Sequence, residues 1–177
     1  MMAIADACAD GRIGAQVGVV VVPKSGLALE GRAVSAGLPV VKVEYEPKLT
    51  YGQRLAAALA ECDLVCLAGY LRLLPIEVLR AFPDRVLNIH PALLPAFGGR
   101  GMYGMRVHEA VVAAGVPESG CTVHVVNECY DEGRILVQRR VPVIPDDSPE
   151  TLAARVLVQE HLAYVEAINI LLGHSFE

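Results

Sequence analysis

Short apolar runs alternate with segments of helical spacing through the first half of the chain. The apolar runs are strand-sized and occupy residues 17–22, 39–43, 64–68 and 85–89. Helical patterns lie between them, at residues 25–35, 49–61 and 75–82. Continuous apolar runs are typical of strands covered on both faces, and their alternation with helices is typical of parallel sheets. The pattern therefore predicts an α/β fold with a doubly wound, mostly parallel sheet.

The pattern changes in the second half of the chain. The expected elements there are a helix at 103–114, strands at 121–126 and 134–143 around a turn at 130–133, and a helix from 149 to about 172. Ser148 before Pro149 and Glu150 is a helix-start signal, and Gly173 is a stop signal. The fold should thus end in a β-hairpin and a long helix. A short helical segment at 1–10 is expected at the other terminus.

Composition limits the class of protein. The chain has 177 residues, 54% of them hydrophobic, so residues 1–177 are expected to form one domain with its own core. A net charge of -5 argues against nonspecific binding to nucleic acid. No apolar run reaches membrane-spanning length and no signal peptide is evident, so we expect a cytoplasmic protein without a membrane partner. The five cysteines are an odd number, which favours reduced thiols.

Asn88 and His90 are the most informative polar residues. They lie at the end of an apolar run, and Pro91 and Pro95 then stop regular pairing. Residues two apart on a strand point to the same side, so an amide and an imidazole can address one point. Asp131 is a candidate third member. Its Asp-Glu-Gly context is equally consistent with a turn former.

Three segments resemble motifs of the folate-dependent formyltransferases. They are residues 67–74 (Leu-Ala-Gly-Tyr-Leu-Arg-Leu-Leu), residues 87–97 (Leu-Asn-Ile-His-Pro-Ala-Leu-Leu-Pro-Ala-Phe), and residues 120–126 together with 131–133. The resemblance covers nearly the whole chain in order. It implies a Rossmann-like formyltransferase fold and transfer of a formyl group from 10-formyltetrahydrofolate, as co-substrate, to the amine of glycinamide ribonucleotide in purine synthesis. Asn88, His90 and Asp131 would be the catalytic residues, and no metal is expected.

The resemblance also implies binding residues. The folate pocket would be lined by Leu67, Tyr70, Leu71, Arg72, Leu73, Leu74, Val126, Asn127 and Glu128, with Lys48 near the glutamate tail. The nucleotide substrate would meet Ile89, Pro91 and Glu160. Core packing is the alternative for the leucines, and an ordinary polar helix position is the alternative for Glu160. His124 is either a support for the site or a core histidine. His108 and His161 are expected to be structural or surface residues.

The sequence departs from the family at its start. The family opens with a strand and a Gly-rich loop that binds the substrate phosphate, whereas the resemblance begins inside the family's first helix. We therefore expect an N-terminally incomplete formyltransferase domain. A longer native chain is the favoured explanation; a fragment completed by another subunit and a different fold around the absent strand are the others.

Three other functions are weighed against transfer to glycinamide ribonucleotide. They are hydrolysis of formyltetrahydrofolate, formylation of methionyl-tRNA and noncatalytic folate binding. In the family the hydrolase and the tRNA enzyme carry additional domains, so the sequence favours the purine transferase. Its partners would be small-molecule substrates and not nucleic acid. A homodimer is kept open, because the sequence does not fix the oligomeric state.

Overall fold

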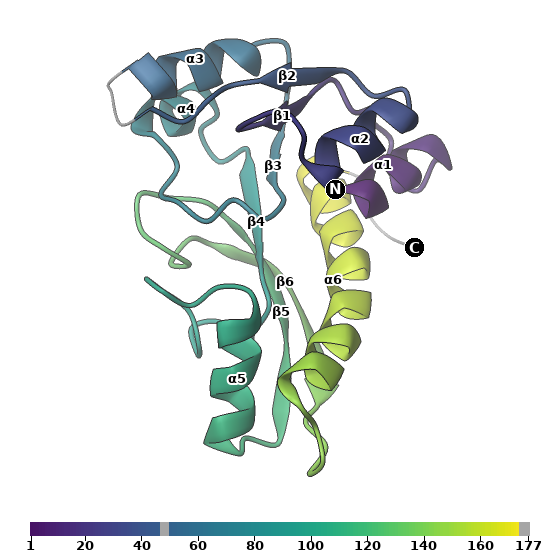
Figure 1. The fold of residues 1–177 in the computed structure, drawn as a ribbon, viewed down its shortest axis with the longest axis vertical. Coiled ribbons are helices and arrows are strands. Elements are labelled where there is room, and N and C mark those ends of the chain that lie inside the picture. Colours follow the sequence, from purple (N-terminus) through teal and green to yellow (C-terminus); the bar gives the residue numbers. More distant parts are fainter. Residues whose placement is uncertain (47–49, 174–177) are drawn as a thin grey trace. The chain divides into compact units, whose positions relative to one another are not determined.

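The computed structural model describes residues 1–46 and 50–173 and has an α/β fold (Figure 1). The α/β class expected from the sequence is confirmed. In chain order the elements are α1 (Met2–Ala9), β1 (Val20–Val22), α2 (Ala28–Ser35), β2 (Val40–Lys42), α3 (Thr50–Ala58), β3 (Val65–Leu67), α4 (Ile76–Ala81), β4 (Val86–His90), α5 (Met105–Ala114), β5 (Glu118–Val125), β6 (Ile135–Pro142) and α6 (Pro149–Leu171).

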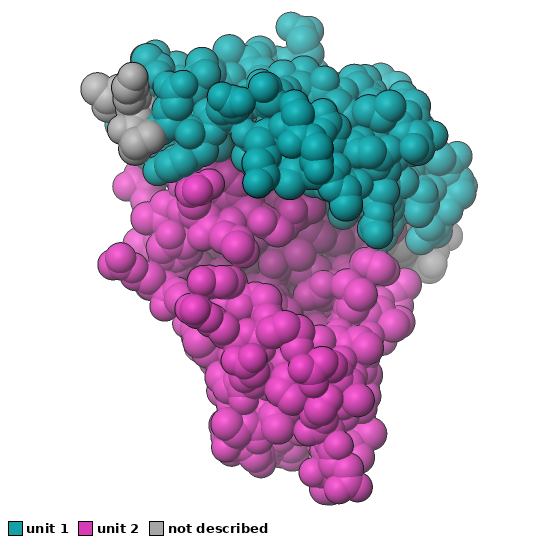
Figure 2. Space-filling model, viewed as in Figure 1, with its two compact units in different colours: residues 1–65, 74–86 teal, residues 66–73, 87–177 magenta. Residues whose placement is uncertain are grey.

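Two compact units make up the chain (Figure 2). Unit 1 comprises residues 1–65 and 74–86, and unit 2 comprises residues 66–73 and 87–177. The organisation of residues 1–177 as one formyltransferase domain stays a prediction. In the described part of the chain, none of the helices combines the length and the apolar character needed to span a bilayer.

Unit 1 is built around a small parallel sheet. β1 and β2 pair in parallel, from Val20 opposite Val40 to Val22 opposite Lys42. The hydrophobic cluster at this sheet contains Val20 and Val22 with Ala33 from α2, and all three side chains are buried. β2 begins only at Val40 because Pro39 has no N–H to donate to a ladder. Val17, which was expected in the first strand, instead packs against this cluster.

Unit 2 contains most of a four-stranded sheet with the order β3-β4-β5-β6. β5 pairs antiparallel with both β4 and β6, so the predicted hairpin is present. α6 packs on β5 and β6 and also contacts α5 (Figure 1). Leu152 and Val156 of α6 are fully buried. The long helix therefore covers β5, the strand beside β4.

The ends of the long helix follow the sequence signals. The Ser148 hydroxyl accepts a hydrogen bond from the Thr151 N–H at 3.3 Å, and Pro149 begins the helix. Gly173 follows the helix with a φ of 75°, a conformation that glycine adopts easily. Gly115 plays the same role after α5 with a φ of 61°. The predicted start and stop of α6 are therefore confirmed.

Candidate active site

The end of β4 forms one polar face with β5. Asn88 lies opposite His124 in the antiparallel register, and His90 lies opposite Thr122. Side chains that face each other across two strands lie on the same side of the sheet. A hydrogen-bonding distance of 3.2 Å between Asn88 Nδ2 and His124 Nε2 shows this directly. Amide and imidazole groups from two strands thus gather at one place.

His90 lies between a carbonyl and a carboxylate. Its side chain is only 4% exposed. Nε2 lies 2.8 Å from the Phe97 carbonyl oxygen, and Nδ1 lies 3.5 Å from Asp131 Oδ2. A carbonyl oxygen can only accept, so Nε2 must carry a proton and donate it. In the neutral ring Nδ1 is then the basic atom, and it faces the carboxylate.

Asp131 comes from the loop between β5 and β6, and both oxygens of its carboxylate have polar neighbours. Its Oδ2 accepts a hydrogen bond from the Gly99 N–H at 2.9 Å, and its Oδ1 lies 3.6 Å from His124 Nε2. The backbone of Asp131 has a φ of 57°, in the left-handed region that aspartate tolerates better than most residues. The carboxylate therefore joins the β4 end, the following loop and β5.

Burial and neighbouring charged or polar groups shift the pKa of each of His90 and Asp131 in opposite directions. Burial lowers the pKa of His90 below its ordinary 6.5, and the Asp131 carboxylate acts in the opposite direction. Burial alone would raise the pKa of Asp131, but contacts with His124 and the Gly99 N–H bring it below its ordinary 3.8. Asp131 is thus ionised at neutral pH, and it favours a proton on the imidazole beside it.

The loop after β4 is fixed to β5 through one hydroxyl. Thr122 Oγ1 donates to the Ala92 carbonyl at 2.7 Å and accepts from the Leu94 N–H at 3.0 Å. Gln138 of β6 donates from Nε2 to the Leu94 carbonyl at 2.8 Å. These bonds position the segment that leads to Phe97 and Gly99. Two main-chain groups of this loop therefore become part of the site.

The three residues predicted as catalytic come together, whereas the predicted binding residues are more dispersed. In the predicted folate wall, Leu67 ends β3, and Leu71 and Leu73 in the next segment are 58% and 47% exposed. The other wall residues in unit 2 are Tyr70, Arg72, Val126, Asn127 and Glu128, and Leu74 is a buried residue of unit 1. Lys48 lies outside the described residues. Their role in folate binding stays a prediction.

The predicted contacts of the nucleotide substrate lie on two elements of unit 2. Ile89 and Pro91 flank His90 and are half-buried. Glu160 lies on α6, where burial raises its pKa, and it interacts electrostatically with Cys121 of β5. Successive strand residues point to opposite faces, so Cys121 faces away from Thr122 and His124. Glu160 is thus not among the groups that surround Asp131.

Sequence reasoning did not find the main-chain partners of the site. The Phe97 carbonyl and the Gly99 N–H are main-chain groups, so no sequence motif indicates their role. The His124 side chain had a signal, because Thr122 and His124 share the period of two that also relates Asn88 to His90. His108 of α5 is 5% exposed, and its Nδ1 has no hydrogen-bond partner within the described residues.

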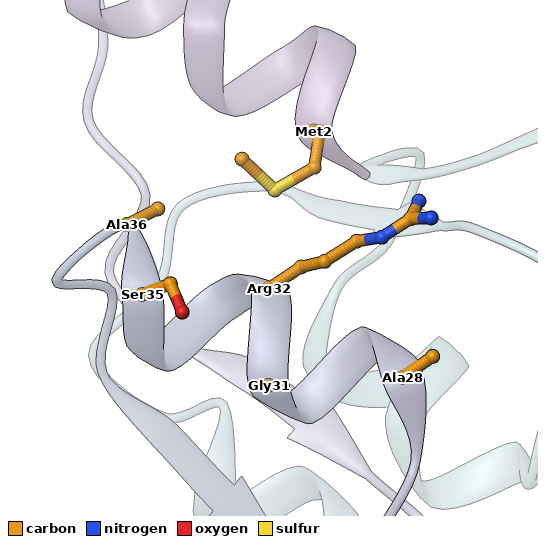
Figure 3. Close-up of a pocket in the computed structure, with 6 residues that line it drawn as sticks. All are labelled: Met2, Ala28, Gly31, Arg32, Ser35 and Ala36. Carbon is orange, nitrogen blue, oxygen red and sulfur yellow. The ribbon is translucent and has the colours of Figure 1, made fainter.

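Unit 1 has a hollow of about 520 Å³ between α1 and α2 (Figure 3). Figure 3 shows the Met2 side chain reaching from α1 toward α2. The lining residues are Met2, Ala28, Gly31, Arg32, Ser35 and Ala36. None of them belongs to the predicted site, and Arg32 is the sole ionisable side chain among them. Across residues 1–46 and 50–173, no cluster of histidine, cysteine or acidic side chains is arranged to hold a metal ion.

Known proteins resemble this chain along nearly its whole length. A model of the formyl transferase family matches residues 1–168. The phosphoribosylglycinamide formyltransferase, chloroplastic, of Arabidopsis thaliana is 48% identical over 172 residues. The match covers 94% of this chain and 59% of the Arabidopsis protein, so the chain spans less than two thirds of that relative.

Solved structures give the same picture. Glycinamide ribonucleotide transformylase 1 of Symbiobacterium toebii is 41% identical, with a TM-score of 0.88 over 96% of this chain and 80% of the other. A formyltetrahydrofolate deformylase of Pseudomonas syringae has a TM-score of 0.86 at 23% identity, over 97% of this chain and 57% of the other. At that identity the likeness is one of fold alone.

Proposed function

Because this chain belongs to the formyl transferase family, we propose that it moves the formyl group of 10-formyltetrahydrofolate to the amine of glycinamide ribonucleotide. One carbon–nitrogen bond forms at the amine and one breaks at N10 of the folate. A proton leaves the amine and ends on N10, which gives the formamide and tetrahydrofolate. The observation that carries this proposal is the convergence of Asn88, His90 and Asp131 at the end of β4.

Attack of the amine on the formyl carbon creates a tetrahedral intermediate with negative charge on oxygen. Such a charge is stabilised by hydrogen-bond donors that are in place before the reaction. Asn88 has two N–H groups on Nδ2, and one of them is directed at His124. The other remains available for the developing oxyanion. We assign Asn88 this role.

His90 and Asp131 form the proton-handling pair of the proposed reaction. The Nε2 proton of His90 is already donated to a carbonyl oxygen, that of Phe97. A formyl oxygen is the same kind of acceptor, so it can replace the Phe97 carbonyl when substrate binds. Asp131 stabilises the imidazolium form beside it and can pass the amine proton onward. In this exchange the hydrogen bond from His90 Nε2 to the Phe97 carbonyl is replaced by one to the formyl oxygen.

The formyl donor would bind along the segment that follows β3. Leu71 and Leu73 are apolar side chains exposed to solvent, and a flat aromatic ligand such as a pterin would cover such residues. Val126, Asn127 and Glu128 would form the facing wall, next to Asp131 in the same loop. Glu160 and the half-buried pair Ile89 and Pro91 would meet the nucleotide substrate. The family resemblance supports these assignments.

The test is the dependence of turnover on the amine. Purified chain is mixed with 10-formyltetrahydrofolate, with and without glycinamide ribonucleotide, and tetrahydrofolate and the formylated amine are measured together. We expect equal amounts of both products and little tetrahydrofolate without the amine. Equal turnover without the amine would mean hydrolysis, and folate binding without turnover would mean a noncatalytic protein.

The cellular context is the remaining part of the proposal. The sequence favours the cytoplasm, whereas the Arabidopsis relative is named as chloroplastic, so the plastid is a second candidate compartment. Immunodetection in fractionated source cells separates the two. All five cysteines lie within the described residues and none of them forms a disulfide bond, which fits either compartment if it is reducing. Sedimentation velocity tests the homodimer that the sequence left open.

A further inference from the structure

His124 is a buried histidine with hydrogen-bonding neighbours at both ring nitrogens. Its side chain is 2% exposed. Nδ1 lies 3.1 Å from the Val125 carbonyl oxygen, and Nε2 lies 3.2 Å from Asn88 Nδ2. A histidine that only filled the core would need no second polar partner from another strand. The second partner here is the residue assigned to the oxyanion.

The neighbours of His124 determine where its proton lies. The Val125 carbonyl can only accept, so Nδ1 must be the protonated nitrogen. In the neutral ring Nε2 then carries a lone pair and can only accept. Of its two neighbours, Asn88 Nδ2 at 3.2 Å and Asp131 Oδ1 at 3.6 Å, only the amide nitrogen can donate to it. The Asn88 amide meets this lone pair with its nitrogen, which donates. Proton position and amide orientation are therefore linked.

The orientation of the Asn88 amide matters for the reaction. If the amide were turned by half a rotation, its oxygen would face the lone pair of His124 and its nitrogen would point elsewhere. Two acceptors would then oppose each other in a buried place, which is unfavourable. His124 thus selects one of two amide orientations of nearly identical shape.

We propose that His124 is a positioning residue, which holds the Asn88 amide so that one N–H remains directed at the reacting formyl oxygen. This inference rests on the proposed function. Asn88 touches the substrate in that scheme, and His124 acts only through Asn88. The Val125 carbonyl fixes which nitrogen of His124 carries the proton. The unprotonated nitrogen of His124 in turn fixes the orientation of the Asn88 amide.

Kinetics test the proposal with three variants. His124→Phe keeps a ring but removes the acceptor, and we expect turnover to fall about 10-fold or more with little change in KM for the formyl donor. His124→Gln places an oxygen near the former Nε2 and should recover most of that loss. In the Asn88→Ala background, His124→Phe should lower turnover by less than a further factor of about two. The reason is that His124 acts through the Asn88 amide, which this background lacks.

Val123→Ala is the matched control. Val123 is the neighbouring residue on β5, is fully buried and points to the opposite face. It should lower stability without changing turnover at a temperature where the protein stays folded. A role of His124 in the fold alone predicts the opposite pattern. His124→Phe would then add its full factor in the Asn88→Ala background, and His124→Gln would be no better than His124→Phe; either result overturns the proposal.

Nitrogen NMR of histidine-labelled protein gives a readout independent of activity. We expect the neutral His124 proton on Nδ1 and the His90 proton on Nε2, so the two rings should show opposite tautomers. A His124 proton on Nε2 overturns the inference even if formyl transfer occurs. Absence of formyl transfer with the expected tautomer would instead remove the proposed function and leave the linkage between His124 and Asn88 intact.

Discussion

At the residue scale, Asn88 contributes a half-buried amide whose nitrogen lies 3.2 Å from His124 Nε2. Replacing Asn88 with alanine removes a donor without disturbing the pairing of β4, which uses main-chain atoms. We expect Asn88→Ala to lower turnover about 100-fold, the usual effect of losing one oxyanion donor, with little change in affinity for the folate. Steady-state kinetics with both substrates measures this.

Val86→Ala is a suitable control for Asn88→Ala. Val86 lies on the same strand, two residues away, and is a buried apolar residue with no hydrogen-bonding side chain. Its truncation should cost stability and leave turnover unchanged. Asn88→Ala with turnover within about twofold of the parent chain would contradict the role assigned to the amide.

His108 makes a prediction about pH. Burial, followed by the neighbouring His90, lowers the pKa of His108 below 6.5. Below about pH 6.5 His108 is protonated in the unfolded chain and stays neutral in the folded chain. Its contribution to the free energy of unfolding therefore becomes more unfavourable as the pH falls. We expect His108→Leu to raise the free energy of unfolding, by more at about pH 5.5 than at about pH 8, in urea titrations.

A gain is expected at both pH values because His108 Nδ1 has no hydrogen-bond partner in the part of the chain that the structure describes, and burying such a group costs about 1 to 3 kcal/mol. His161 of α6 is exposed, so His161→Leu is the matched control and should change stability little at either pH. A stabilisation by His108→Leu that shrinks on acidification would contradict the sign of the pKa shift.

At the element scale, the loop between β5 and β6 depends on Gly133. A Cβ at this position would collide with the carbonyl of Val125, the group that also accepts from His124. Gly133→Ala should therefore destabilise the chain by about 1–3 kcal/mol and reduce turnover, since His124 and Asp131 both shift. Thermal unfolding and kinetics on the same preparation measure the two effects.

Gly31 of α2 provides the contrast for Gly133. Apart from its chain neighbours and its own helix backbone, no atom of the described residues lies within 4 Å of a Cβ placed there, and its φ is not positive. Gly31→Ala should therefore stabilise the helix by about 0.5–1 kcal/mol. Equal tolerance of alanine at both positions would mean that the Val125 carbonyl is free to move, contrary to its hydrogen bonds.

The elements also show what the sequence can and cannot reveal. Asn88 and His90 were visible because both lie on one strand with the period of two, and α6 was visible because Ser148 and Gly173 mark its ends. The pairing of Asn88 with His124 required the register of β4 and β5, which depends on the packing of two segments far apart in the chain. Main-chain contributions from Phe97 and Gly99 follow from the path of a loop, and no residue type encodes that path.

At the scale of the whole molecule, the reactivity of each cysteine thiol depends on how deeply the fold buries it. Cys121 is fully buried and burial raises its pKa to about 12, whereas Cys129 is exposed. The thiolate is the reactive form, so a buried thiol with a raised pKa reacts slowly. We expect iodoacetamide to modify Cys129 quickly in native buffer and Cys121 only after unfolding in urea. Peptide mass spectrometry identifies the modified residue, and equal rates in native buffer would contradict the packing of α6 on β5.

The backbone of Asp131 has a consequence for how such proteins diverge. Its φ of 57° suits aspartate, asparagine and glycine, and only aspartate carries charge. Aspartate and asparagine codons differ by one base, so a single nucleotide change can remove the carboxylate while the loop keeps its shape. A gene copy with that change would still produce a folded chain with the same outline. A single codon can thus change the charge in the site while the backbone conformation of the loop is inherited unchanged.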